Sequence, residues 1–139
     1  MRTFKTLVLI SALQMCSAVY AGNINVNIDN LIANEGKIYA SLCQQNNFMN
    51  GRCHFEIVRK VQHSQQKLTF NDVGDGTYAI SVFYDKNDNG ELDTSLFGIP
   101  KEPTGVSNNV AAKNGPPQFQ EASFEVTAGE SVQIQISVF

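Results

Sequence analysis

Residues 74–85 read GDGTYAISVFYD, and this stretch decides the fold. Its first three residues, Gly74, Asp75 and Gly76, are typical turn formers. Two sets of residues then alternate with period two: Tyr78, Ile80, Val82 and Tyr84 in one set, and Thr77, Ala79, Ser81 and Phe83 in the other. This period places the two sets on opposite faces of a β-strand. The stretch therefore predicts a central strand that begins after a tight turn.

Two more stretches alternate in the same way, one near each end of the chain. Their apolar residues are Ile24, Val26 and Ile28 in the first, and Val132, Ile134, Ile136 and Val138 in the second. They predict the first and last strands. Four shorter stretches bounded by Gly, Asn or Asp favour additional strands at residues 37–42, 54–59, 66–70 and 122–126. About seven strands in total suit a β-sandwich.

Helices are expected only as short turns, because residues 22–139 carry no sustained apolar repeat at helical spacing. An α/β architecture is therefore excluded. A chain of 139 residues favours one domain, which we place at residues 22–139. Lys and Arg number 10 against 13 Asp and Glu, for a formal charge of -3. No strong basic field exists to hold a nucleic acid backbone, so we expect no nucleic-acid partner.

Residues 1–21 read as a secretory signal peptide. Arg2 and Lys5 precede an apolar run, and Val19 and Ala21 suit the signal peptidase, so cleavage after Ala21 is expected. The run is too short to span a membrane, which takes about 20 apolar residues. A lipoprotein with a modified Cys16 is the alternative, and it is disfavoured because Gln14 and Met15 are large for that peptidase. The sequence therefore predicts a periplasmic or secreted protein.

Two cysteines remain after removal of the signal, Cys43 and Cys53. Disulfides persist outside the cytoplasm, and the polar, turn-rich residues between the two cysteines suit a loop that joins two strands. We therefore expect a structural Cys43–Cys53 bridge. The strand parity of Cys43 is opposite to that of Leu42, so at least one cysteine is expected outside the regular part of its strand.

The densest polar cluster follows the central strand and reads DKNDNGELD at residues 85–93. It resembles a calcium loop, in which alternate residues supply oxygen ligands around a glycine turn. The predicted ligands are Asp85, Asn87, Asn89 and Asp93, with the backbone carbonyl of Glu91. Leu96 stands where that motif places a bidentate glutamate, and a strand precedes the loop in place of a helix. A solvated turn remains the alternative, because Asp, Asn and Gly dominate turns for backbone reasons.

Three blocks carry a family resemblance: Gly76–Asp93, Phe97–Asn109 and Gly115–Phe124. Together they resemble the bacterial exported family known as domain of unknown function 2141. The strand that enters through Gly76 and Tyr78 is also similar to that of prealbumin-like, Cna-B-type sandwiches. The resemblance implies a single immunoglobulin-like (prealbumin-like), antiparallel β-sandwich of about seven strands with one long loop. It does not imply an activity, since fold analogy does not fix function.

The long loop is residues 85–121, which contain all four prolines and no clear strand. Long loops without secondary structure are usually functional or disordered. The positions that carry the resemblance nearly coincide with this loop. We therefore take as candidate ligand contacts Phe97, Pro100, Glu102, Asn108, Asn109, Pro116 and Phe119.

These observations favour a non-catalytic binding or accessory module of the cell envelope that presents the 85–121 loop. Its expected partner is an envelope protein, a peptide or a glycan, and calcium is the one cofactor considered. A hydrolase is the first alternative, with Asp85, Asp93 and Glu102 in acid and base roles. A purely structural envelope protein is the second. The hydrolase ranks lower because no G-x-S-x-G turn or other nucleophile signature is present, and a small sandwich rarely provides the cleft that paired carboxylates need.

Overall fold

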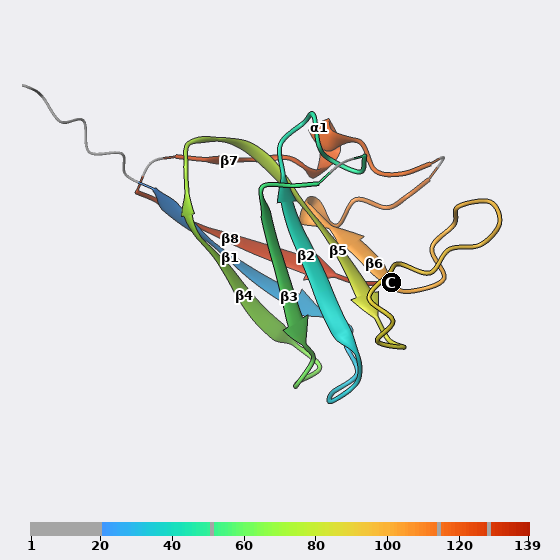
Figure 1. Ribbon diagram of the computed structural model, residues 1–139. Coiled ribbons are helices and arrows are strands. Elements are labelled where there is room, and N and C mark those ends of the chain that lie inside the picture. The colour runs from blue at the N-terminus through green and yellow to red at the C-terminus, as the bar shows by residue number, and fades with distance from the viewer. Residues whose placement is uncertain (1–20, 51, 114, 128) are drawn as a thin grey trace, which may run out of the picture.

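A computed structural model describes residues 21–139 except 51, 114 and 128, so the predicted signal peptide lies, apart from Ala21, outside the described residues. The described chain forms two β-sheets packed as a sandwich (Figure 1). The strands are β1 (Gly22–Asp29), β2 (Lys37–Cys43), β3 (Phe55–Lys60), β4 (Gln66–Val73), β5 (Gly76–Asp85), β6 (Thr104–Val106), β7 (Phe124–Val126) and β8 (Ser131–Ser137). The helical turns are η1 (Ser107–Asn109) and α1 (Phe119–Ala122). The predicted sandwich and the predicted scarcity of helix are both confirmed.

The predicted central strand is confirmed as β5, which is paired along both of its edges. β2 runs antiparallel along one edge, from Lys37 opposite Asp85 to Cys43 opposite Ala79. The other edge is shared by two short strands, because β6 pairs with residues 81–83 and β7 with residues 76–78. β3 completes the five-stranded sheet beyond β2. The period of two in the sequence places one set of β5 side chains on the core face of the sheet. Ile80, Val82 and Tyr84 of this set are buried in the core.

The second sheet has three strands in the order β4-β1-β8. β1 pairs antiparallel with β4 and parallel with β8, in a register that runs from Asn23 opposite Ser131 to Asp29 opposite Ser137. The expectation of an antiparallel sandwich is therefore wrong for this one pair. Alternation within a strand fixes its faces but not the direction of its neighbour, so the sequence pattern does not distinguish the two arrangements.

The core lies between the sheets and takes residues from both of them. It joins Ile24, Val26, Ile28, Leu68, Phe70 and Ile136 of the three-stranded sheet to Ile38, Ala40, Leu42, Ile80, Val82 and Tyr84 of the five-stranded one. Tyr84 is fully buried, and its hydroxyl bonds to backbone groups of Ile32 and Glu35 in the β1–β2 connection. Burial raises the pKa of Tyr84 above its ordinary value.

The 85–121 segment is not one long loop, which corrects the prediction. It contains β6, η1 and most of α1, so it divides into a loop at residues 86–103 and a second at residues 110–118. β6 is missed in the sequence because Thr-Gly-Val is too short to display a period of two. It forms because Ser81, Val82 and Phe83 of β5 offer it a free strand edge.

β6 also connects the two sheets. The backbone groups of Thr104 and Phe139 exchange two hydrogen bonds, each of 3.1 Å. Gly105 lies against β8 so closely that a Cβ there would meet the Ser137 carbonyl oxygen at 2.7 Å and Ile136 Cγ2 at 2.8 Å. Glycine is therefore required at this position by the approach of the neighbouring strand.

Cys43 and Cys53 form the predicted disulfide. Cys53 lies before β3, as the parity argument requires of one cysteine, while Cys43 ends β2 and faces away from the main core. There it joins a second cluster with Phe48, Ala79 and Val106. Closing a loop of this size contributes about 2–3 kcal/mol to the free energy of unfolding. Such bridges are typical of extracytoplasmic proteins.

None of the helices within the described ranges is long and apolar enough to cross a membrane.

Gly105→Ala is expected to lower the free energy of unfolding by about 1–3 kcal/mol, because the added methyl group must displace β6 from β8. Urea denaturation measures this difference. Gly74→Ala is the matched control, since a Cβ at Gly74 meets no atom within 4 Å. Its effect should stay within about 0.5 kcal/mol. Equal stability of the two variants would contradict the close packing of β6 on β8.

Candidate functional site

The first half of the candidate site is the loop of residues 86–103, which leaves β5 at Asp85. The Asp85 side chain is fully buried, and its two carboxylate oxygens accept hydrogen bonds from the backbone N–H groups of Asn89 at 3.2 Å and Gly90 at 2.8 Å. Gly90 adopts a positive φ of 84°, a conformation that favours glycine. The turn predicted around this glycine is therefore present, with Asp85 at its centre.

Asn87 and Asn89 build the next part of the loop through both ends of their side-chain amides. Asn87 Oδ1 accepts from the backbone N–H of Asn89 at 3.2 Å. Asn89 Oδ1 accepts from the backbone N–H of Glu91 at 2.9 Å. Their Nδ2 groups both donate to Asp93, at 2.7 and 3.2 Å. These are the local side-chain bonds that make Asn and Asp frequent in turns. The Glu91 side chain is exposed.

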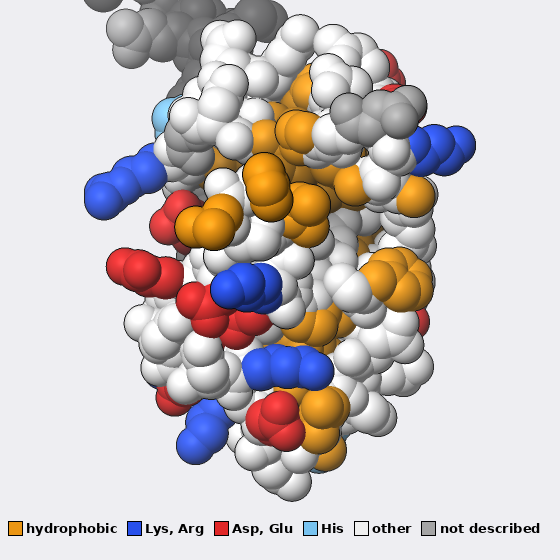
Figure 2. Space-filling model, turned by 90° about the vertical axis from the view of Figure 1, so that its right-hand side faces the viewer, with side chains coloured by type: hydrophobic (Ala, Val, Ile, Leu, Met, Phe, Trp, Pro, Cys, Tyr) orange, Lys and Arg blue, Asp and Glu red, His pale blue; other side chains and the backbone are white. Residues whose placement is uncertain are grey.

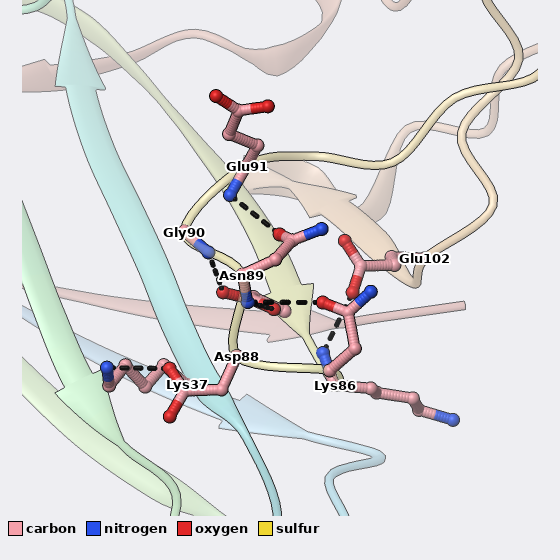
Figure 3. Close-up of polar contacts among 9 residues, drawn as sticks. Lys37, Lys86, Asp88, Asn89, Gly90, Glu91 and Glu102 are labelled. Carbon is pink, nitrogen blue, oxygen red and sulfur yellow. Dashed lines mark hydrogen bonds and ion pairs between the residues drawn. The ribbon is translucent and has the colours of Figure 1, made fainter.

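Glu102 holds two points of the loop, Lys86 and Asp93, through its carboxylate. Only 8% of its surface is exposed. Its carboxylate accepts from the backbone N–H of Lys86 at 2.9 Å, a bond drawn in Figure 3. It also accepts from the backbone N–H of Asp93 at 3.2 Å. A charged acceptor strengthens both bonds. The sequence placed Glu102 among the ligand contacts and gave no signal of this bracing role, which depends on residues sixteen and nine positions away.

A single ion pair links the loop to the neighbouring strand. Lys37 Nζ at the start of β2 lies 2.6 Å from Asp88 Oδ1, and Figure 3 shows the two side chains reaching toward one another. The hydrogen bond with Asp88 raises the pKa of Lys37 above its ordinary value. Sequence reasoning missed this pair, because a contact between two residues 51 positions apart leaves no local pattern.

The tip of the loop is a small hairpin. Thr94 and Pro100 form an isolated antiparallel bridge, and the Ser95 N–H donates to the Ile99 carbonyl at 2.8 Å. The backbone N–H of Lys101 donates to the Asp93 carbonyl at 2.8 Å, which extends the pairing toward the base. Leu96, Phe97 and Ile99 project from this tip with relative exposures of 102%, 90% and 63%. We call these three side chains the apolar tip.

The second half of the candidate site lies at the opposite end of β5, next to the disulfide. Phe119 on α1 packs edge-on against Phe48, with ring centroids 5.8 Å apart. Pro116 and Phe119 border a shallow hollow of about 260 Å³ together with residues 45 and 48–50. Phe97 and Pro100 lie on the hairpin tip and do not line this hollow. The structure does not bring the predicted ligand contacts together as one site.

Asn108 and Asn109 lie in the chain between the 86–103 loop and the 110–118 loop. With Ser107 they form η1, and the three consecutive side chains bond to three different parts of the fold. Ser107 Oγ accepts from the Ile80 N–H at 2.9 Å and donates to the Ala122 carbonyl at 2.5 Å. Asn108 Nδ2 donates to the carbonyls of Glu121 and Ser123. Asn109 Oδ1 accepts from the Ser137 N–H, and Asn109 Nδ2 donates to the Gln135 carbonyl. We call these residues the Ser-Asn-Asn clamp.

The family model described as "Uncharacterized protein conserved in bacteria (DUF2141)" matches residues 26–135. The chain belongs to this family. No curated protein and no solved structure matches the sequence. The match spans the 86–103 loop, the Ser-Asn-Asn clamp and both cysteines of this DUF2141 domain, and confirms the resemblance read from its three sequence blocks.

The DUF2141 domain does not bring three or more His, Cys, Asp or Glu side chains together in a metal-binding arrangement anywhere in its described part. The predicted calcium ligands Asp85, Asn87, Asn89 and Asp93 do converge on the loop, yet their polar atoms bond to the loop itself. Calcium would have to displace the amide groups of Asn87 and Asn89 from Asp93. The calcium site stays a prediction.

Glu102→Gln should loosen the base of the loop, because one amide oxygen replaces two carboxylate oxygens and one of the two N–H donors loses its acceptor. A loss of about 1–2 kcal/mol is expected locally, which corresponds to roughly five- to thirty-fold faster amide exchange at Lys86 or Asp93. Hydrogen exchange followed by NMR measures it. Glu91→Gln is the control, since the Glu91 side chain is exposed. Unchanged exchange in Glu102→Gln would exclude the bracing role.

Proposed function

We propose that this protein is an exported, non-catalytic binding module of the bacterial envelope, periplasmic or secreted, whose apolar tip contacts a partner protein. The disulfide and the predicted signal peptide support export. A bacterial source is supported by the family.

The apolar tip is the observation that carries this proposal. Leu96 and Phe97 expose nearly all of their surface on one short hairpin, and Ile99 exposes most of its own. Figure 2 shows hydrophobic side chains gathered on the face of the molecule that this hairpin occupies, with basic and acidic side chains beside them. Exposed apolar side chains with a polar rim are typical of protein interaction sites.

The loop beneath the tip is held in place before any partner binds. Asp85 and Glu102 receive four backbone hydrogen bonds between them, and Lys37 anchors Asp88. A preorganised loop loses less conformational entropy on binding than a mobile one. This arrangement suits a contact surface better than a flexible linker.

The hydrolase alternative is disfavoured by the placement of its carboxylates. Asp85 and Glu102 are buried and bonded to backbone N–H groups, so neither faces a substrate. The two hollows identified on the described surface lie at the other end of the sandwich, and neither is lined by a carboxylate. An acid–base pair needs a cleft that brings both groups to one bond. A structural envelope protein remains the second alternative, and it would not require the tip to be exposed.

A photo-crosslinking residue placed at Phe97 should form discrete adducts with a partner protein in intact cells of the source bacterium. The same residue at Val58, which is 53% exposed on the outer face of β3, is the control and should give none. Leu96→Ser/Phe97→Ser should abolish binding of that partner protein while changing the free energy of unfolding by no more than about 0.5 kcal/mol per substitution. Identical adduct patterns at both positions would refute the proposal.

Calcium is proposed as a stabiliser of the same loop through Asp85, Asn87, Asn89, Asp93 and the Glu91 carbonyl. Millimolar calcium should then raise the melting temperature by mass action, and Asp85→Ala should abolish that rise. Calorimetry with and without chelator measures both. Because Asp85 also holds the turn, Asp93→Asn serves as a second variant, which keeps the shape of the side chain and removes its charge. Equal calcium responses in the native protein and Asp93→Asn would exclude the site.

A further inference from the structure

Two neighbouring hollows at the disulfide end of the sandwich share Gln45 and Phe119. The first has a volume of about 320 Å³ and is lined by Gln44, Gln45, Asn46, Thr77 and Phe119. The second, of about 260 Å³, lies between the turn at residues 45–50 and the segment 116–120. Together they form one continuous, shallow surface that we call the amide groove. Its combined volume is within the range of ligand sites, about 300–1,000 Å³.

The lining of the amide groove is uncharged. It contains no Asp, Glu, Lys, Arg or His, although 17% of the chain is charged. A charged ligand would therefore find no opposite charge in the groove. The chemistry of the lining selects a neutral ligand.

Five side-chain amides border the groove and are free to bind: Gln44, Gln45, Asn46, Asn50 and Gln120. All five are exposed, and within the described ranges none of them forms a hydrogen bond through its side chain. Each amide offers two donors and one carbonyl acceptor. Such groups match ligands whose polar atoms both donate and accept, as the neighbouring hydroxyls of a sugar ring do.

Apolar surface lies beside these amides. It comes from Phe119, Met49, Pro116 and Pro117, and Phe48 packs edge-on against the Phe119 ring. A sugar ring presents one face of C–H groups in addition to its hydroxyls, so it can cover an aromatic ring while it bonds to amides.

The backbone under the groove is fixed. The Cys43–Cys53 disulfide closes the turn, the Asn47 and Phe48 N–H groups donate to the Gln44 carbonyl, and Asn47 Nδ2 donates to the Arg52 carbonyl at 2.6 Å. The other wall starts at Gln118, which forms a capping box with Glu121. The site is therefore preorganised, although its ligand contacts come from turns.

We propose that the amide groove binds an uncharged glycan. A peptide fits the groove less well, because extended peptides commonly bind by adding a strand to a free sheet edge. Thr77, the strand residue of the lining, is already paired with Glu125 of β7. The apolar tip lines neither hollow, so this inference does not depend on the proposed protein partner.

NMR titration of the purified protein, with its disulfide intact, tests the proposal. The probes are the neutral hexasaccharides of cellulose, chitin and starch, the anionic hexagalacturonate and a proline-rich decapeptide. At least one neutral hexasaccharide should shift the side-chain NH₂ signals of Gln45 and Gln120, with a Kd of about 0.1–1 mM, as expected of a shallow site. Hexagalacturonate should bind at least ten-fold more weakly.

Gln45→Ala/Gln120→Ala should weaken the neutral glycan at least ten-fold and leave the melting temperature unchanged, because neither side chain bonds within the fold. Gln133→Ala, an exposed glutamine on β8, is the control and should bind as the native protein does. Leu96→Ser/Phe97→Ser should also bind normally, which separates this test from that of the apolar tip. The proposal is overturned if no neutral hexasaccharide binds, if the double variant binds equally well, or if only the peptide shifts these signals.

Discussion

The Ser-Asn-Asn clamp is the contact on which the arrangement of the whole molecule depends. Two sheets can pack through apolar side chains alone, but apolar contacts are not directional and do not fix where the edges meet. The clamp is directional. It ties the backbone of β5 in one sheet to β8 in the other and to α1. It requires Asn108 and Asn109 at positive φ, 63° and 50°, a region that asparagine tolerates better than most residues.

The fold was predictable from the sequence to the extent that it is written in local alternation. β5 could be assigned because ten residues repeat one pattern and end at a polar cluster. β6 could not, since it exists only where β5 leaves an edge free and where Gly105 lets β8 approach. The parallel pairing of β1 with β8 was not predicted for a related reason. The direction of pairing depends on the path of the chain between the two strands, and a period of two in each strand does not specify that path.

The residues of the candidate site could be predicted from the sequence better than their contacts could. The cluster at residues 85–93 is real, and its glycine turn lies where the spacing placed it. The role of Glu102 could not be read, because its two partners become neighbours only after the hairpin closes. The division of the 85–121 segment had larger consequences. β6 and η1 carry the chain away from the apolar tip toward the disulfide, so Phe97 and Phe119 belong to different surfaces.

The parallel neighbours β1 and β8 also constrain the order in which the molecule can assemble. Asn27 Nδ2 bonds to Gln135 Oε1 at 2.7 Å across 108 positions of sequence. When the chain emerges from a ribosome or a translocation channel, β1 emerges before β4 and β8. The β1 edge that pairs with β8 stays unpaired until β8 has emerged. Contacts of such long separation slow folding. The three-stranded sheet is therefore completed only after synthesis or passage has brought β8 into reach.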